Sequence, residues 1–337
     1  MRVLVAGGAG YVGSVLIPRL LDKGFDVICL DRVFFGIEPM KDFIDDIEFF
    51  NIDIREKLPK TIFDGVDTLV NLAAISQPDE LQRINPELYY EINYLAAVNL
   101  AKRAKQFGVN RHIFTSTCSV YGAQNVLLSE VSEPKPLEAY GKSKLMAEIE
   151  ILELNSKDFT VTVIRPGTMY GYSPKMRFDL VVNAMTWSLF KFGKINVMRP
   201  GTQVRPNVHV DDVCSAIIKI IESETSIIER EIFNIGSTDQ NYEIQQLAEL
   251  IGRSVTNDYS IEWFGEGDRR TYCVIFQKLR DILGFKPKHT VQNAAKNIYE
   301  KLINGEIEKR INTLVINWYE KLEEENLIFP YNLRKSK

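Results

Sequence analysis

Residue types that hold metals or form disulfide bonds are scarce in this sequence. Its 337 residues include only four cysteines and three histidines. The cysteines are widely separated and form no C-x-x-C pair, and no histidine stands at metal-ligand spacing from another. We therefore expect a protein of the reducing cytoplasm, with no disulfide framework and no metal site.

Long apolar runs and an excess of charge of one sign are also missing. The longest apolar runs fall well short of the ~20 residues that span a bilayer, and the apolar stretch at 3–6 is too short for a signal peptide. With 41 Lys and Arg against 45 Asp and Glu, the net charge is −4. This balance gives no reason to expect nucleic acid or a membrane as a partner.

The first half of the chain alternates short apolar, β-branched runs with stretches of helical periodicity. This alternation predicts an α/β fold with a doubly wound parallel sheet. The runs are almost continuously apolar, as in strands that are buried on both faces. We expect strands at 3–6, 27–30, 48–52, 68–72, 112–115, 161–165 and 232–235, and helices at 11–23, 86–107 and 139–154.

Beyond about residue 170 the alternation of strand and helix patterns becomes irregular, because prolines and glycines interrupt it. We predict a dinucleotide-binding domain formed by 1–169, to which segments at about 206–238 return. A smaller, discontinuous lobe, formed by 170–205 and 239–337, is expected to bind the substrate and to carry the C-terminal helices.

A glycine-rich segment follows the first expected strand and opens the first expected helix. Gly7, Gly10 and Gly13 fit the pattern G-x-x-G-x-x-G, and Gly8 replaces Gly7 in G-x-G-x-x-G. Glycines at these offsets allow a tight turn and bring backbone N–H groups close to a pyrophosphate, whose charge the helix N-terminus favours. The strand–turn–helix context therefore predicts a Rossmann-type dinucleotide site rather than a merely flexible turn.

Acidic residues end the second and follow the third expected strand. Asp31 lies 18 residues after Gly13, where a carboxylate accepts hydrogen bonds from the adenosine ribose and repels a 2′-phosphate. NAD is therefore expected rather than NADP, although the neighbouring Arg32 weakens this inference slightly. Asp53 is a candidate contact of the adenine, and an exposed turn aspartate is nearly as good an interpretation.

A tyrosine and a lysine stand four residues apart at the start of the helix expected at 139–154. Tyr140 and Lys144 would lie one above the other on a helix face, so that the ammonium favours the phenolate. Tyr331 and Lys335 have the same spacing in the charged tail, so the pattern alone is weak. Tyr140, however, follows the strand expected at 112–115, which continues into the hydroxyl-rich segment 115–119. Those hydroxyls would face the crevice at the carboxyl edge of the sheet, where such folds bind ligands.

Together these residues resemble the extended short-chain dehydrogenase/reductase superfamily, and within it the NAD-dependent epimerase/dehydratase family. The resemblance covers nearly the whole chain and is specific for the family, but much less specific for the reaction. It rests on Asp31 and on the segments 7–14 (GGAGYVGS), 53–55, 71–74, 117–122, 140–144, 165–171, 205–212 and 268–272.

The resemblance implies roles for residues along the whole chain. Thr117, Tyr140 and Lys144 would form the catalytic triad, with Cys118 as a further candidate, and Lys144 and Tyr140 would also contact NAD. A nucleoside-diphosphate sugar would be the substrate, bound by Thr117, Asn183, Arg205 and Arg270. The segment 176–180 (MRFDL) also resembles part of the family's substrate lobe, with no individual roles assigned. The remaining cofactor-binding residues would be Gly7, Gly10, Tyr11, Val12, Gly13, Asp31, Arg32, Asp53, Ile54, Leu72, Ala73, Ala74, Asn93 and Pro166.

The helices expected at 86–107 and 139–154 resemble the pair that forms a dimer interface in this family. A homodimer is therefore expected. The alternative is that both helices are ordinary amphipathic helices that pack only on their own sheet.

The family's shared first step would oxidise a sugar hydroxyl, most often at C4, with Tyr140 as the base and NAD⁺ as hydride acceptor. Sugar 4,6-dehydratases of the family carry an Asp-Glu pair directly after the threonine, where this chain has Cys118 and Ser119. An epimerase is therefore the first hypothesis, an NDP-sugar 4-dehydrogenase the second, and an atypical dehydratase with a Cys118 thiolate as base the third. A small buried side chain is the favoured interpretation of Cys118. A non-catalytic NAD-sensing protein is disfavoured because the triad is complete.

Overall fold

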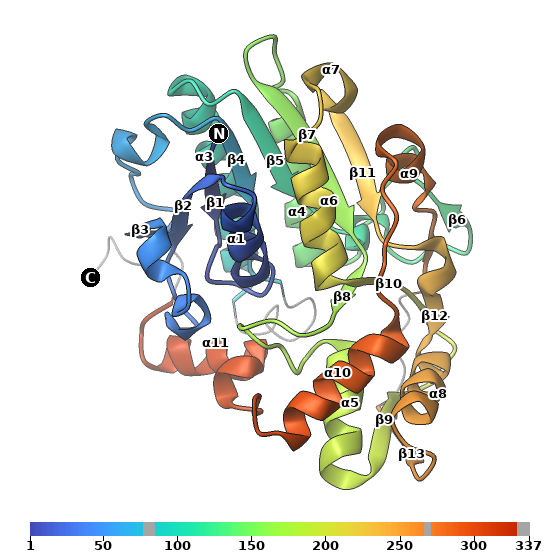
Figure 1. The fold of residues 1–337 in the computed structure, drawn as a ribbon. Coiled ribbons are helices and arrows are strands. Elements are labelled where there is room, and N and C mark those ends of the chain that lie inside the picture. Colours follow the sequence, from blue (N-terminus) through green and yellow to red (C-terminus); the bar gives the residue numbers. More distant parts are fainter. Residues whose placement is uncertain (77–84, 266–270, 329–337) are drawn as a thin grey trace.

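A computed structural model describes residues 1–76, 85–265 and 271–328 of the chain (Figure 1). Seven parallel strands form the central sheet in the order β11-β7-β5-β4-β1-β2-β3. The chain runs outward from β1 to β3 and then returns to β4 on the other side of β1, so that the strand order reverses between β1 and β4. The strands are β1 (Arg2–Ala6), β2 (Asp26–Asp31), β3 (Glu48–Asn51), β4 (Thr68–Asn71), β5 (Arg111–Thr115), β7 (Thr160–Pro166) and β11 (Glu231–Ile235).

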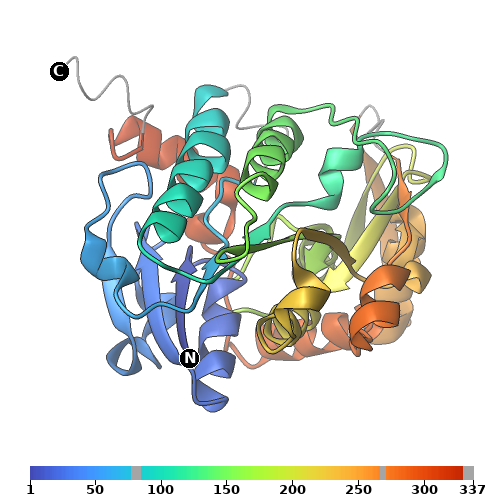
Figure 2. The ribbon, with the colours of Figure 1, turned by 90° about the horizontal axis from the view of Figure 1, so that it is seen from above.

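Helices cover both faces of this sheet, as Figure 2 shows from above. On one face, α1 (Gly13–Asp22) and α6 (Val210–Ile221) pack through side chains such as Leu16 and Ile217. On the other face lie α3 (Ala97–Gln106) and α4 (Ala139–Leu152), with Leu100 and Ala147 in the core. The predicted α/β fold with a doubly wound parallel sheet is confirmed.

The helix predicted at 86–107 is confirmed, but its geometry changes along its length. Its first part, η4 (Tyr89–Ala96), is π-helical, and α3 continues directly from it. A π-helical stretch within a helix commonly marks a functional position, because the wider turn re-aims its side chains. Here the stretch contains Asn93, which is fully buried.

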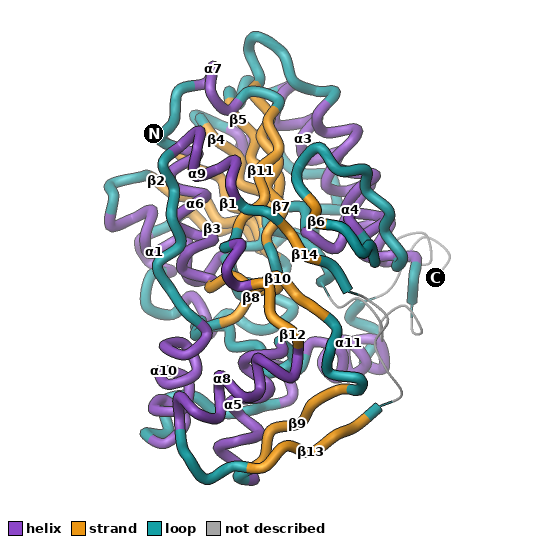
Figure 3. The backbone as a smooth tube through the Cα atoms, turned by 90° about the vertical axis from the view of Figure 1, so that its right-hand side faces the viewer, coloured by secondary structure: helices purple, strands orange, loops and turns teal. Residues whose placement is uncertain are grey.

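A smaller lobe lies below the carboxyl edge of the sheet in Figure 1, around an apolar cluster that includes Val182, Leu247 and Ala295. Figure 3 shows β8 and β10 between the central sheet and this lobe. The lobe and its connections contain β8 (Thr168–Tyr170), α5 (Val181–Phe192), β9 (Lys194–Met198), β10 (Val204–His209), β12 (Asn241–Glu243), α8 (Ile244–Val255), β13 (Ser260–Phe264) and α10 (Val291–Ile303). The shorter elements are η1 (Glu38–Met40), η2 (Ile44–Asp46), η3 (Lys60–Phe63), η5 (Cys118–Tyr121), β6 (Leu127–Leu128), α7 (Thr225–Ile228), η6 (Thr238–Gln240), β14 (Cys273–Val274) and η7 (Ile311–Thr313).

Two helices beyond residue 239 share core clusters with the central sheet. Leu279 and Leu283 of α9 (Gln277–Leu283) join the core cluster of α1 and α6. The helix α11 (Val315–Glu324) lies below the carboxyl edge of the sheet (Figure 1), where its apolar side joins the core cluster of α3 and α4. Trp318 Nε1 of α11 donates to the carbonyl oxygen of Phe34, just after β2. An amphipathic pattern predicts a buried side but not the surface that buries it, so the boundary near residue 239 stays a prediction.

Two histidines that are distant in the sequence stack at the junction between the sheet and the lobe. The rings of His209 and His289 have centroids 4.2 Å apart, and Asp211 lies beside both. Asp211 is also paired with Arg19 of α1, at 2.5 Å. Within the described ranges, no helix combines the length and apolar character needed to cross a membrane.

Gly7, at the end of β1, is held where no side chain fits. Its φ is +83°, and a Cβ atom there would lie 2.6 Å from the backbone nitrogen of Ala73, which follows β4. Gly24, after α1, has a similar φ of +78°, but a Cβ atom there would meet no atom within 4 Å. Both glycines therefore have a positive φ that a residue with a side chain rarely adopts, and only at Gly7 would a side chain also clash with neighbouring backbone.

We expect Gly7→Ala to destabilise the protein much more than Gly24→Ala. The left-handed backbone conformation costs an alanine about 1–2 kcal/mol at either site. At Gly7 the clash with the β4 connection adds to this cost, so the loss should be at least about twice as large or prevent folding. Urea unfolding followed by circular dichroism measures both losses. Equal losses would contradict the close approach of the two strand ends.

Candidate active site

A cavity of about 760 Å³ opens beyond the carboxyl ends of the central strands. The glycine loop, the ends of β5 and β7, the start of α4, the segment after β8 and the start of α11 contribute to its lining. A smaller cavity of about 120 Å³ lies beside it and shares Gly7, Gly10, Leu72 and Ala74 with it. The second cavity is also lined by Asp31, Arg32, Asp53, Ile54 and Ala73.

The glycine loop forms the wall between the sheet and the larger cavity. Gly7 donates its backbone N–H to the carbonyl oxygen of Leu30 at 2.8 Å, and a Cβ atom on Gly13 would lie 2.5 Å from the carbonyl oxygen of Gly7. Tyr11 donates its hydroxyl to the carbonyl oxygen of Gly171 at 2.6 Å, and Val12 precedes the first residue of α1. Burial raises the pKa of Tyr11, which keeps it a neutral donor.

Asp31 is fixed at the rim of the smaller cavity by two backbone donors. Its carboxylate accepts from the N–H of Ala9 at 2.9 Å and from the N–H of Val33 at 2.7 Å. Burial raises the pKa of Asp31, and these hydrogen bonds oppose the rise. A fixed carboxylate beside a glycine turn at the start of α1, with no room for a side chain at Gly7, fits the ribose and pyrophosphate of a dinucleotide.

Asp53 is buried and paired within the wall of the same cavity. Arg55 donates to its carboxylate through Nε at 3.1 Å and Nη2 at 2.7 Å, and also contacts Glu91 of η4 at 3.1 Å. The pairing excludes the exposed turn interpretation of Asp53. Its contact with adenine stays a prediction.

Asn93 joins the connection after β4 to helix α4. Its side chain donates to the carbonyl oxygen of Ile75 at 2.9 Å and accepts from the N–H of the same residue at 2.8 Å. It also contacts the Ser143 hydroxyl at 3.5 Å, next to Lys144 in α4. Asn93 therefore fixes the main chain just after Leu72, Ala73 and Ala74.

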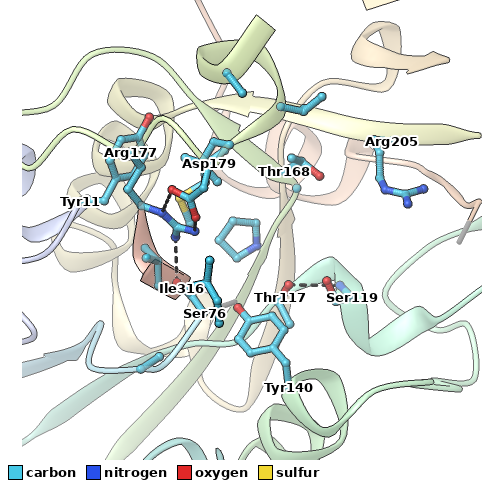
Figure 4. A pocket seen from close by; sticks show the side chains of 18 of the residues that line it. Tyr11, Ser76, Thr117, Ser119, Tyr140, Thr168, Arg177, Asp179, Arg205 and Ile316 are labelled. Carbon is cyan, nitrogen blue, oxygen red and sulfur yellow. Dashed lines mark hydrogen bonds and ion pairs between the residues drawn. The ribbon is translucent and has the colours of Figure 1, made fainter. Parts of the chain in front are cut away.

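Tyr140, Thr117 and Lys144 all line the larger cavity. Thr117 Oγ1 accepts from the N–H of Ser119 at 3.1 Å, and Figure 4 shows Thr117 and Tyr140 at the same wall of the pocket. Lys144 Nζ donates to the carbonyl oxygen of Thr115 at 2.7 Å. Burial raises the pKa of the Tyr140 phenol and lowers the pKa of Lys144 to about 7. Pro166, at the end of β7, lines the same cavity.

A buried ion pair anchors α4 to the sheet. Arg165 of β7 donates through Nε to Glu148 of α4 at 3.1 Å and through Nη1 to the Tyr121 hydroxyl at 3.0 Å. Tyr121 in turn donates to Asn234 of β11 at 2.8 Å. Since partners for all these buried groups are present, α4 holds Tyr140 in a fixed position relative to the sheet.

The Cys118 thiol is bonded inside the core and is not among the groups that line the larger cavity, where a base would have to act. This thiol donates to the carbonyl oxygen of Arg165 at 3.1 Å, and the Cys118 side chain packs with Val120 and Tyr121. Burial raises the pKa of the Cys118 thiol, so the thiolate is disfavoured. This geometry favours the packing interpretation of Cys118.

The residues predicted to hold the sugar nucleotide have different surroundings. Arg205 lines the cavity and lies over the ring of Tyr272, at 5.7 Å from its centroid. Asn183 is fully buried and bonds to the main chain of Gly171 and Arg177, so in this structure it braces the segment after β8. Its role in binding diphosphate stays a prediction. Arg270 lies outside the described residues.

The structure adds side chains to which the sequence pattern gave no role. Arg177 and Asp179 lie in a segment that the family resemblance included without assigning functions, and both line the cavity. Tyr319 of α11 lines both cavities, and its ring packs edge-on against Phe35 at 5.4 Å. No local signal marks Tyr319, because its place depends on the packing of α11.

The profile of the family described as "NAD dependent epimerase/dehydratase family" matches residues 3–236. The chain belongs to this family. It is an enzyme family that depends on NAD, and the residues around both cavities fit that cofactor. Gly7 and Gly10 would face its pyrophosphate, Asp31 its adenosine ribose, and Tyr140 and Lys144 its nicotinamide side. Gly13 packs against Gly7 and Gly8 inside the turn, and its contact with the cofactor stays a prediction.

Individual members of the family resemble the chain over most of its length. The UDP-glucose 4-epimerase of Corynebacterium glutamicum is 30% identical over 308 residues, which cover 86% of this chain and 92% of that protein. The UDP-glucose 4-epimerase of Lacticaseibacillus casei is 29% identical, with coverages of 86% and 92%. The solved structure of MoeE5 in complex with UDP-glucuronic acid and NAD shares the fold, with a TM-score of 0.79, 23% identity and coverages of 90% and 100%.

We expect Asp31→Asn to weaken NAD binding and to reduce the preference for NAD over NADP. The change removes the charge that accepts ribose hydrogen bonds and repels a 2′-phosphate. Hydrogen bonds to charged groups contribute about 1.5–3 kcal/mol, so the NAD dissociation constant should rise about tenfold or more. Calorimetric titration with both dinucleotides measures this.

Asp26→Asn is the matched control for the cofactor prediction. Asp26 begins the same strand, β2, and its side chain is 64% exposed at the opposite edge of the sheet. The control should bind both dinucleotides like the unmutated protein. Equal affinities of the unmutated protein for NAD and NADP would overturn the role given to Asp31.

Proposed function

We propose that this chain is an NAD-dependent nucleotide-sugar epimerase. It would oxidise a hydroxyl of a nucleoside-diphosphate sugar, at C4, to a transient ketone and then return the hydride to the opposite face. The relatives described as UDP-glucose 4-epimerases support UDP-hexoses as the substrate class. The observation that carries the choice of reaction is the pair that follows Thr117, because Cys118 and Ser119 supply no carboxylic acid there.

The residues that line the cavity would have different roles in this reaction. Tyr140 takes the proton from the C4 hydroxyl, and Thr117, which lines the same wall of the cavity, donates to the developing alkoxide. Bound NAD⁺ supplies the hydride acceptor. Tyr140 later returns the proton to the same oxygen. The cavity of about 760 Å³ gives the ketone room to turn over before the hydride returns.

The remaining hypotheses differ in the group that they require next to Thr117. A dehydratase needs an acid that protonates the leaving hydroxyl, whereas the Cys118 thiol donates to a backbone carbonyl and has a raised pKa. A 4-dehydrogenase needs no such acid, so it remains the second candidate. The lobe formed by 170–205 and the chain after 239 would hold the sugar nucleotide, with Arg205 on its diphosphate.

An isotope experiment separates these reactions. We expect UDP-glucose that carries deuterium at C4 to give UDP-galactose with the label retained, because the same hydride leaves and returns. No deuterium should enter from D₂O. Mass spectrometry of the product checks both statements, and Tyr140→Phe, which should still bind NAD, is the inactive control.

Two outcomes would contradict epimerisation. Loss of the mass of one water with gain of solvent deuterium would indicate a dehydratase. NADH that accumulates at one equivalent per active site would indicate a 4-dehydrogenase. Unchanged turnover by Tyr140→Phe would contradict the catalytic role proposed for this site.

We also propose a homodimer formed through the helices η4, α3 and α4. These helices lie side by side on the outside of the sheet (Figure 2), and Tyr94 of η4 donates to Glu150 of α4. Leu95 and Ile149, on the same helix pair, are 50% and 56% exposed. The free cysteines and the NAD dependence support a cytoplasmic location for this dimer.

We expect the double variant Leu95→Asp/Ile149→Asp to sediment as a monomer, because charges would have to be buried at the apolar contact. Ile303→Asp is the control, since Ile303 is 61% exposed at the end of α10 in the other lobe. Sedimentation velocity should show a dimer for this control and for the unmutated protein. An unmutated protein that sediments as a monomer would contradict the proposal.

A further inference from the structure

A buried lysine stands at the junction of the two cavities. Lys175, which follows β8, is only 5% exposed and lines the larger cavity. Its ammonium lies over the ring of Phe35, at 3.7 Å from the ring centroid. Among the residues that the structure describes, no hydrogen bond or ion pair involves Lys175 Nζ. Burying a cation without an anion is costly, so this arrangement points to a ligand that brings negative charge.

The groups around Lys175 leave its charge without a counter-ion. Burial lowers the pKa of Lys175 to about 7, Arg177 lowers it further, and Asp179 opposes both effects. Asp179, however, already accepts from Arg177 with both carboxylate oxygens, at 3.1 and 2.5 Å. Tyr319 packs edge-on against Phe35 and is kept neutral, because burial raises the pKa of Tyr319. An anion placed beside the amine would restore its charge.

The chain that carries Lys175 is tied to the glycine loop. Ser173, two residues earlier, donates its hydroxyl to the carbonyl oxygen of Tyr11 at 2.8 Å and contacts the Ser14 hydroxyl at 3.0 Å. Tyr11 in turn donates to the carbonyl oxygen of Gly171 at 2.6 Å. All three contacts are buried, so the backbone near Lys175 is fixed relative to the first turn of α1.

The two cavities meet close to the ammonium of Lys175. Gly7 and Phe35 line both of them. The smaller cavity contains Asp31, which would hold the adenosine ribose, and the larger one contains Tyr140 on the nicotinamide side. A dinucleotide that occupies both cavities must therefore pass its pyrophosphate through their shared boundary, between the glycine loop and the ring on which the ammonium lies.

We propose that Lys175 binds the pyrophosphate of the dinucleotide, together with the backbone of the glycine loop. An ammonium suits this place, because it is a compact point charge that binds phosphate oxygens. The segment that carries Lys175 leads into α5, so both parts of the fold would hold the cofactor. The inference rests on the NAD dependence of the family and not on which reaction the enzyme catalyses. It concerns a residue outside every motif on which the family resemblance rests.

Calorimetric titration of Lys175→Met tests this contact without turnover. Methionine keeps an unbranched side chain on Phe35 and removes the charge. We expect the dissociation constants of NAD⁺ and ADP-ribose, which share the pyrophosphate, to rise by the same factor, about tenfold or more. Adenosine, which has no phosphate, and UDP, whose diphosphate would lie at Arg205, should bind as they do to the unmutated protein.

Proton uptake on binding gives a second readout. The phosphates favour the charged amine, so the pKa of Lys175 should rise from about 7 when NAD⁺ binds. At pH 8 the free amine is mostly neutral, so the unmutated protein should take up about half a proton or more beyond the uptake of Lys175→Met. Titrations in two buffers with different heats of ionisation measure this difference. Lys144, whose pKa is also lowered to about 7, is present in both proteins, so its contribution cancels.

Lys278→Met is the matched control. Lys278 also lies over a phenylalanine ring, that of Phe233, at 5.2 Å from its centroid, but it lines neither cavity. This control should bind all four ligands like the unmutated protein. Because Lys175→Met removes a buried charge that has no counter-ion, urea unfolding of the cofactor-free variant should show no loss of stability. A loss of affinity then reflects the missing charge rather than a folding defect.

Three results would overturn the proposal. Unchanged affinities for NAD⁺ and ADP-ribose would leave Lys175 only a packing role on Phe35. An equal loss of affinity for adenosine would indicate a distorted smaller cavity, and a loss confined to UDP would assign the charge to the diphosphate of the substrate. None of these results depends on turnover, so a failure of the proposed epimerase reaction is recognised separately, by the isotope experiment.

Discussion

The close approach of two strand ends determines the rest of this site. At Gly7, where the chain leaves β1, the backbone lies directly against Leu72 and Ala73, where the chain leaves β4. The two chains depart toward opposite faces of the sheet. The crevice between these departing chains is where open parallel sheets bind ligands. Asp31 at the end of the next strand, Asn93 behind Ile75, and helix α4 are all arranged around that point.

The candidate active site is built from charged and titratable groups that the fold removes from water. Such burial is costly unless each group is paired, and the structure provides partners from different elements. Arg165 pairs with Glu148, Arg177 with Asp179, and Asp31 with backbone N–H groups. The same burial shifts the pKa values of Tyr140 and Lys144, so the stability and the reactivity of the site have a common physical origin.

Local patterns in the sequence were sufficient to predict the strands of the sheet. They were also sufficient to mark the glycine loop, Asp31 and the Tyr140–Lys144 pair as candidate site residues. Each of these depends on residues that are close in the chain and on a regular period. The partners of Arg177, the stack of His209 on His289, and the position of α11 depend on contacts across the fold. No period or spacing encodes such contacts, so a pattern could mark the segment around Arg177 but could not give it a role.

The position of α11 also has a consequence for the chain entropy of the site. Tyr319 lines both cavities, and Trp318 bonds to Phe34, which lies 284 positions earlier in the chain. A contact that closes so long a segment costs conformational entropy, which the contact alone does not offset. The wall that α11 contributes to both cavities therefore depends on the sheet that holds the intervening chain in place.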